Sequence, residues 1–194
     1  MLQIRSYLNA ITPVSDEDWE KICSRLVPKV FAKNELLVQE GAVCSEVYFI
    51  ETGIIRLYVV TDGKEICRQF FFENNFFSVY ESFLNQSPSK NFAGALEDTK
   101  VYSFSYADMQ WFYQTIPSFQ LIGRKIAEML FLKISERVNS FLTESPDVRY
   151  RRLIESRPHV IQRIPQYMIA SYLGITPEHL SRLRKKRSGN NGAH

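Results

Sequence analysis

The hydrophobic positions of the chain change period along its length, and each period predicts a different kind of element. Over residues 2–26 apolar side chains recur every three or four residues, as in amphipathic helices. Pro13 divides this segment, and Ser15 with the acidic residues after it predicts a helix cap. Over residues 27–104 short β-rich runs alternate with turns, which favours an antiparallel roll or barrel. Residues 61–64 (TDGK) predict a tight hairpin inside this region.

The helical period returns at residue 106. A short helix over 106–114 is followed by one long amphipathic helix over 118–142. We expect a linker over 143–147 and then a basic helix over 148–162, interrupted near Pro158. The apolar stripe of the long helix either packs on its own domain or pairs with a second copy, as in a coiled coil. The candidate dimer residues on this stripe are Ile122, Ile126, Met129, Leu130, Ile134 and Val138.

The last elements predict two short helices that meet at a tight corner. The first covers residues 166–173, and Ala170 is small enough to let a crossing helix approach closely. Gly174 ends this helix, Thr176 is suited to cap the next one, and Pro177 is suited to its first position. The apolar residues that hold the second helix against the first are Ile175, Leu180 and Leu183.

A helix-turn-helix of this kind places its second helix in the major groove of DNA. The alternative is an ordinary helical hairpin with a solvated charged face, but the basic end of the second helix favours DNA. We predict that Arg182 reads a base edge, whereas Arg184, Lys185, Lys186 and Arg187 bind phosphate. The candidate DNA-binding residues are Gln166, Thr176, Glu178, His179, Ser181, Arg182, Arg184, Lys185 and Lys186.

Composition supports a basic module attached to an acidic body. The formal net charge is +3, but residues 148–194 hold 10 Lys/Arg against 2 Asp/Glu, and residues 1–147 hold 14 against 19. Such asymmetry suits contact with a polyanion through one end of the chain. The three cysteines are widely spaced, which predicts free thiols rather than disulfides or a zinc site. With no signal peptide or membrane span predicted, we expect a cytoplasmic protein.

Order and motifs together resemble the Crp/Fnr transcription regulators over nearly the whole chain. The motifs that carry the resemblance are YFIETGIIRLYVVTDGKE in the roll and IASYLGITPEHLSRLRKK at the C-terminal end. The resemblance implies an α+β fold with a jelly-roll-like sensor over residues 1–117, a dimerisation helix over 118–142 and a DNA-binding domain over 143–194. It also implies a bacterial homodimer on a near-palindromic operator, with RNA polymerase as a further partner. Pro177 stands where many members carry an arginine, so the operator sequence need not match theirs.

The sensor departs from the cyclic-nucleotide-binding members of the family. In their phosphate cassette a Gly-Glu pair is followed by an arginine with Ser or Thr. Here Glu81 matches the glutamate, Tyr80 replaces the glycine, and Asn91 stands near the arginine position, with Lys90 as the nearby cation. We therefore expect no cofactor and no response to cyclic AMP, while a different small effector stays open. The degenerate effector pocket consists of Tyr80, Glu81, Ser89, Lys90 and Asn91.

Other functions receive less support. An iron–sulfur sensor needs four cysteine ligands, and the chain has three cysteines. A haem sensor needs an axial His or Cys ligand, and no histidine lies before His159. We find no paired-carboxylate site, His-rich metal site or P-loop, so an enzyme is not expected. The alternative to a DNA-binding regulator is a cyclic-nucleotide-binding module that acts through protein contacts.

Overall fold

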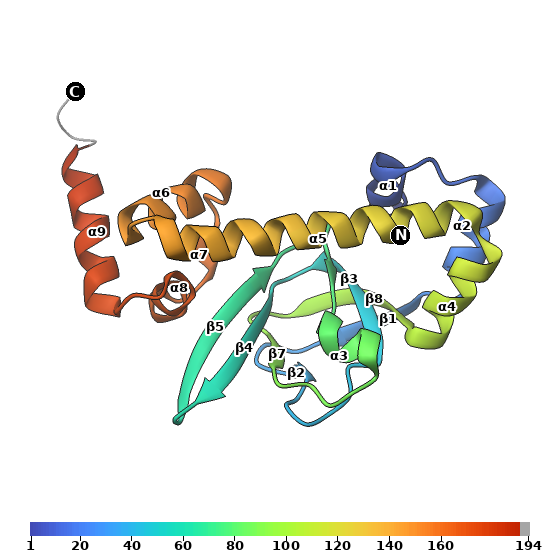
Figure 1. The fold of residues 1–194 in the computed structure, drawn as a ribbon, viewed down its shortest axis with the longest axis horizontal. Helices are drawn as coiled ribbons and strands as arrows, with labels where there is room; N and C mark the ends of the chain where they lie inside the picture. Colours follow the sequence, from blue (N-terminus) through green and yellow to red (C-terminus); the bar gives the residue numbers. More distant parts are fainter. Residues whose placement is uncertain (191–194) are drawn as a thin grey trace. The chain divides into compact units, whose positions relative to one another are not determined.

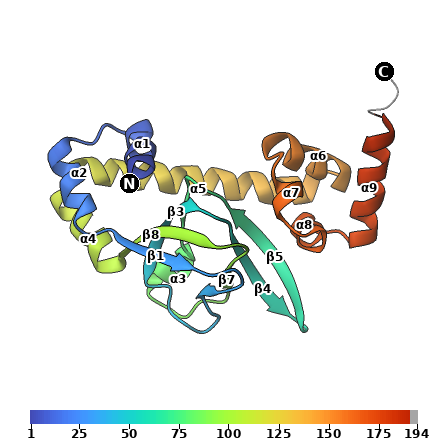
Figure 2. The ribbon, with the colours of Figure 1, turned by 180° about the vertical axis from the view of Figure 1, so that it is seen from behind.

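A computed structural model describes residues 1–190 of the chain, with side chains through Lys186 (Figures 1 and 2). The chain divides into two compact units. The first consists of Met1–Val59 and Gln69–Phe131, and the second of Val60–Arg68 together with the chain from Leu132 onward. The predicted α+β fold with an antiparallel β-roll and a long helix is confirmed.

Two helices open the first unit, as their apolar spacing predicts. Helix α1 covers Leu2–Ile11 and α2 covers Asp16–Cys23, with Pro13 between them. The hydroxyl of Ser15 accepts a hydrogen bond from the backbone N–H of Asp18 at 3.1 Å, which confirms the predicted cap.

Within residues 1–190, eight short strands form two four-stranded sheets in the orders β1-β8-β3-β6 and β2-β7-β4-β5. Figure 2 shows β1 beside β8 at one edge of the first sheet, where the two strands pair antiparallel. Asp62 and Gly63 both have positive φ (51° and 72°), the conformation of a two-residue hairpin turn, so the hairpin predicted over residues 61–64 is confirmed. The strands are β1 Val27–Phe31, β2 Leu36–Val38, β3 Glu46–Thr52, β4 Ile55–Thr61, β5 Lys64–Phe71, β6 Phe76–Phe77, β7 Phe92–Ala95 and β8 Thr99–Ser105.

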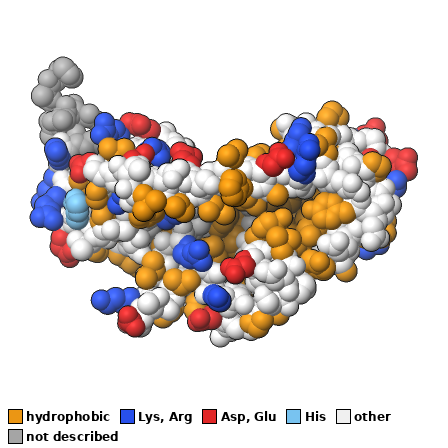
Figure 3. All heavy atoms as spheres, in the orientation of Figure 1, with side chains coloured by type: hydrophobic (Ala, Val, Ile, Leu, Met, Phe, Trp, Pro, Cys, Tyr) orange, Lys and Arg blue, Asp and Glu red, His pale blue; other side chains and the backbone are white. Residues whose placement is uncertain are grey.

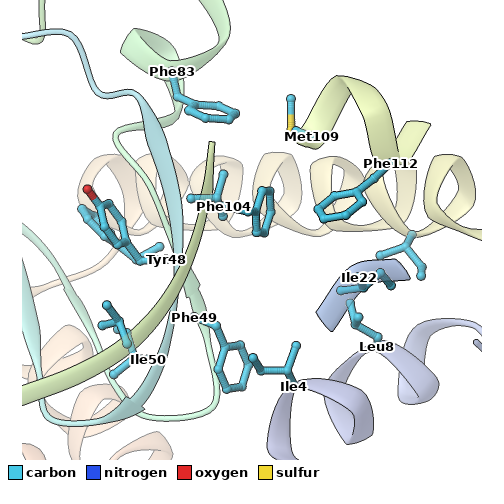
Figure 4. Packing of buried hydrophobic residues seen from close by; sticks show 14 of the residues in the cluster. Ile4, Leu8, Ile22, Tyr48, Phe49, Ile50, Phe83, Phe104, Met109 and Phe112 are labelled. Atoms are coloured by element: carbon cyan, nitrogen blue, oxygen red, sulfur yellow. The ribbon is translucent and has the colours of Figure 1, made fainter. Parts of the chain in front are cut away.

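The core of the first unit joins the β1-β8-β3-β6 sheet to the helices that pack on it (Figure 4), and it also includes Val38, Ile55 and Ala93 of the second sheet. Phe104 of β8 meets Phe112 of α4 (Tyr106–Thr115) edge to face, with ring centroids 5.4 Å apart. On the other side of the cluster, Ile4 of α1 lies beside Phe49 of β3. These apolar groups fix the roll against the helices through burial, without a disulfide, because all three cysteines are free thiols.

Helix α5, Pro117–Thr143, runs from the first unit into the second. The linker expected over 143–147 is shorter than predicted, because Ser145 caps α6 (Pro146–Ser156) through the backbone N–H of Val148. The backbone N–H of the first helical residue has no partner within the helix, so a proline there loses no hydrogen bond. Pro146 therefore begins α6 and does not extend the linker. A further short helix, α7 (Val160–Arg163), follows the predicted break near Pro158.

The chain then forms α8 (Gln166–Leu173) and α9 (Pro177–Asn190), the two predicted corner helices. Helix α9 continues to Asn190, past the end of the IASYLGITPEHLSRLRKK motif at Lys186. The predicted phosphate contact of Arg187 lies outside the described side chains, and residues 191–194 lie outside the described chain.

Candidate nucleic-acid interface

The corner between α8 and α9 depends on Gly174. Its φ of +69° is left-handed, a conformation that a residue with a Cβ adopts only under strain. A Cβ at this position would also lie 2.9 Å from Cε1 of Phe141, so the Phe141 ring would have to shift to admit a side chain. The backbone N–H of Ile175 donates to the carbonyl of Ala170 at 3.0 Å, which closes the end of α8. The turn is therefore fixed both by conformation and by packing.

The start of α9 is built as the sequence predicts. The hydroxyl of Thr176 accepts a hydrogen bond from the backbone N–H of His179 at 3.2 Å, and Pro177 occupies the first helical position. The carboxylate of Glu178 accepts hydrogen bonds from its own backbone N–H and from Thr176, and these lower its pKa. Glu178 therefore stays charged near neutral pH and can accept a hydrogen bond from a base or repel a phosphate.

One face of α9 is buried and the other is open to solvent. Leu180 and Leu183 are buried, and Ala170 of α8 is fully inaccessible, so these residues form the predicted contact between the two helices. His179 and Arg184 lie at the boundary. The predicted DNA-binding side chains that the structure leaves exposed are Gln166, Thr176, Glu178, Ser181, Arg182, Lys185 and Lys186.

Part of this open face is hollowed. A shallow depression is lined by Gln166 at the start of α8 and by Ser181, Arg184 and Lys185 on α9. Lys and Arg side chains gather on this end of the second unit (Figure 3). Amide, hydroxyl and cationic groups in one depression can all donate hydrogen bonds to a phosphate oxygen.

Two arginines that sequence reasoning missed support the corner from behind. Arg137 of α5 donates to the carbonyl of Tyr172 at 3.0 Å, and its guanidinium lies 3.9 Å from the centroid of the Tyr172 ring. Burial lowers the pKa of Arg137. Arg149 of α6 donates to the carbonyl of Leu173 at 3.1 Å and lies 4.6 Å from the ring of Phe141. Cations at the C-terminal carbonyls of α8 complement its dipole, so these side chains position the helix.

The sequence placed Arg137 among the surface charges of the long helix, because it lies off the apolar stripe. Arg137 binds a backbone carbonyl of α8. Because every residue carries such a carbonyl, the sequence does not identify this partner. The signal that was available is the aromatic residue Tyr172 late in α8, beside which an arginine can stack.

The five residues of the predicted effector pocket do not form one charged lining. Ser89 and Asn91 are buried, and the Ser89 hydroxyl accepts from the backbone N–H of Asn91 at 2.9 Å. Glu81 and Lys90 are exposed. Tyr80 begins α3 (Tyr80–Asn85) and packs against the core, and this burial raises the pKa of its hydroxyl.

A buried cation in the roll was not anticipated. Arg56 of β4 is 8% exposed, and its guanidinium lies 3.9 Å from the centroid of the Tyr58 ring. Tyr58 in turn stacks on Phe92 with centroids 5.2 Å apart. The alternation of side chains along a strand puts Arg56 and Tyr58 on one face, which was the readable signal.

The apolar stripe of α5 separates into a buried and an exposed part. Ile122 is 1% exposed and belongs to the core of the first unit, and its assignment to the dimer interface stays a prediction. Ile126 packs partly on the same core and Leu130 is half-buried. Met129, Ile134 and Val138 are exposed, as are the neighbours Phe131, Leu132 and Leu142, which the prediction did not include.

Comparisons with known proteins agree with this architecture. Residues 28–116 match the family model of the cyclic nucleotide-binding domain. Among curated protein sequences the chain has no match.

Solved structures with the same fold cover most of the chain. FixK2 from Bradyrhizobium japonicum superposes with a TM-score of 0.71 at 17% identity over 86% of each chain. A putative transcriptional regulator of the crp/fnr family from Eubacterium rectale gives a TM-score of 0.71 at 14% identity, over 95% of this chain and 88% of that one. A CooA mutant from Carboxydothermus hydrogenoformans gives 0.67 at 17% identity, over 87% and 78%.

Within the described residues, no group of three or more His, Cys, Asp or Glu side chains is placed to hold a metal ion. Among the helices that the structure describes, none combines the length and the apolar character needed to cross a membrane.

Proposed function

We propose that the chain, which contains a cyclic nucleotide-binding domain and has the fold of the Crp/Fnr regulators, is a homodimeric DNA-binding transcription regulator. The observation that carries the proposal is the open face of α9. This helix is capped at Thr176, held inward by Leu180 and Leu183, and presents Arg182, Lys185 and Lys186 to solvent. A helix anchored on one face and cationic on the other suits the major groove.

Arg182 is the residue proposed to read sequence. Its planar guanidinium can donate two parallel hydrogen bonds to O6 and N7 of guanine. Arg184 and Lys185 line the depression beside Gln166 and are proposed to bind phosphate, which fixes the register of the helix. Glu178 is proposed to accept from cytosine N4.

The exposed stripe on α5 is proposed to pair with the same stripe of a second copy. Phe131, Ile134 and Val138 are more than half exposed in the single chain, and a large apolar patch on a helix favours association. A two-fold dimer matches a near-palindromic operator, whose half-sites lie about 34 Å apart. RNA polymerase is proposed to bind the outer surface of this dimer–DNA complex.

The roll is proposed to sense a ligand other than cyclic AMP. The cassette places Tyr80 where close backbone approach is needed, and its Ser89 hydroxyl is bonded within its own loop. The Arg56–Tyr58–Phe92 stack provides a buried aromatic and cationic environment instead.

The test is selection of bound sequences from random DNA, followed by gel shifts with the selected operator. We expect enrichment of a two-fold symmetric sequence and affinity at least a thousandfold above random DNA at physiological salt, about the lower limit for specific regulators. Failure to enrich any sequence would contradict the proposal. It would favour the second candidate, a cyclic-nucleotide-binding module that acts on a protein, for which the match over residues 28–116 is the supporting observation.

A further inference from the structure

The tip of the β4–β5 hairpin belongs to the same compact unit as the helix-turn-helix. The unit includes Val60–Arg68, whereas the rest of both strands belongs to the roll. The hairpin is thus a continuous arm, with its base in the sensor unit and its tip in the DNA-binding unit.

One side chain of α8 joins the helix-turn-helix to this tip. The Ser171 hydroxyl accepts a hydrogen bond from the backbone N–H of Cys67 at 2.9 Å. It also donates to the carbonyl of Glu65, with the two oxygens 3.4 Å apart. A single hydroxyl therefore binds two backbone groups of β5.

The position of β5 explains why these groups are available. It is the outermost strand of the β2-β7-β4-β5 sheet, and an edge strand carries a row of backbone groups without a neighbouring strand. Cys67 is 3% exposed, so the hydrogen bond from its N–H to Ser171 lies away from solvent. Leaving such a group unsatisfied costs more than an exposed hydrogen bond contributes.

The contact leaves the proposed DNA surface free. Ser171 follows Gln166 by five residues, which is about 140° around an α-helix. Gln166 lines the depression with Ser181 and Lys185, whereas Ser171 meets β5. The hairpin can therefore stay attached while α9 is bound to DNA.

We infer that Ser171 is a positioning residue that fixes the orientation of the helix-turn-helix through the hairpin, and thereby sets the half-site spacing that the dimer accepts. The inference rests on the proposed function as a dimeric DNA-binding protein. One recognition helix can dock on a half-site whatever its orientation relative to a second copy. Two helices can dock together only if each is held in a fixed orientation, because otherwise binding must order them.

The experiment compares Ser171→Ala with the wild type on three DNAs: the selected operator, the same operator with one base pair inserted between the half-sites, and a single half-site. Ser171→Thr retains the hydroxyl and serves as the rescue variant. Ser156→Ala is the matched control, since the Ser156 hydroxyl donates only to carbonyls of its own helix, Arg152 and Leu153.

We expect Ser171→Ala to bind the half-site as the wild type does. Its preference for the native over the lengthened operator should fall roughly threefold to tenfold, the effect of one lost hydrogen bond. Ser171→Thr and Ser156→Ala should keep the wild-type preference. Amide exchange at Cys67 should accelerate in Ser171→Ala alone.

Two results would overturn the inference while leaving the proposed function intact. The first is an unchanged spacing preference in Ser171→Ala, and the second is an equal loss of affinity on the half-site, which would assign Ser171 to local folding of α8. Unchanged exchange at Cys67 would show that the contact itself is absent in solution. If the wild type binds no DNA, the proposed function fails first and the inference fails with it.

Discussion

A single carboxylate, that of Glu46, joins three strands of the β1-β8-β3-β6 sheet. Its Oε2 lies 2.5 Å from Nζ of Lys29 on β1 and accepts from the hydroxyl of Tyr48 at 3.1 Å. Its Oε1 accepts from the hydroxyl of Ser103 on β8 at 3.0 Å. Burial pushes the pKa of Glu46 upward, but the hydrogen bonds from Lys29 and Ser103 outweigh it and the pKa is lowered.

We predict that Glu46→Gln destabilises the first unit by about 1–3 kcal/mol at pH 7, since an amide cannot pair with the ammonium group. The folded pKa lies below the unfolded value, so the carboxylate contributes stability that is fully present above about pH 4.5 and is lost as pH falls through the folded pKa. Urea unfolding of both proteins at pH 7 and at pH 3.5 measures this, and the gap should narrow at the lower pH. Glu17→Gln, which alters an exposed helical pair with Lys21, is the control and should have little effect. A gap independent of pH would show that Glu46 acts through packing alone.

On the proposed DNA surface, truncation of Arg182 and truncation of Lys185 are expected to change DNA binding in different ways. Arg182→Ala should cost about 1–3 kcal/mol on the operator and relax the base preference at one position, because a bidentate contact to guanine is lost. Lys185→Ala should weaken operator and random DNA alike and lower the salt slope by about one. Fluorescence anisotropy at several salt concentrations separates the two. Equal losses on operator and random DNA for Arg182→Ala would remove it from base reading.

How well single residues could be predicted depended on whether their partners lie nearby in the chain. The roles of Gly174 and Thr176 follow from conformation and capping within one turn, and both were predicted correctly. Arg137, Arg149 and Ser171 bond to backbone groups of distant elements, for which the sequence has no marker. Each of these three contacts joins α8 to another element of the second unit.

At the scale of elements, the exposed stripe of α5 gives the clearest prediction. Ile134 is 62% exposed in the single chain, so Ile134→Glu should leave each chain folded while placing like charges across the proposed seam. Analytical ultracentrifugation should show a monomer at concentrations where the wild type is a dimer, with weakened operator binding.

Asn139→Glu supplies the matched control, because it adds the same charge at an exposed position off the stripe. It should leave the dimer intact. A wild type that sediments as a monomer at micromolar concentration would refute the assignment of α5 to dimerisation. Ile122→Glu, by contrast, should unfold the first unit, because Ile122 lies in its core.

Periodic elements were readable, whereas their partners were not. The 3.6-residue period located α5, α8 and α9 closely, and turn chemistry located the hairpin at Asp62 and Gly63. The sheet order β1-β8-β3-β6 joins strands that lie far apart in the sequence, and pairing over such separations leaves no local sequence pattern. For the same reason the sequence could not divide the α5 stripe into a core half and an exposed half.

At the scale of the whole molecule, the proposed function couples a sensor to a DNA-binding unit. Two elements run from one unit into the other, α5 and the β4–β5 hairpin. A ligand can change DNA affinity only by as much as its own affinity differs between the states that these elements link. The identity of that ligand therefore depends on what the roll can bind, and the cassette residues decide whether a cyclic nucleotide fits.

We predict that cyclic AMP and cyclic GMP leave operator affinity unchanged. A cyclic phosphate carries a full negative charge, and burying it requires a cation and several backbone donors. In this cassette Lys90 is exposed, the Ser89 hydroxyl is bonded to Asn91, and Tyr80, which stands at the position expected for a glycine, packs against the core. Loss of a charge-assisted pair forfeits ~1.5–3 kcal/mol, roughly tenfold to a hundredfold in affinity, before any steric cost. Calorimetric titration with both nucleotides, on protein whose operator binding shows that it is folded, measures this. Binding tighter than roughly ten micromolar, with a matching rise in operator affinity, would contradict this prediction.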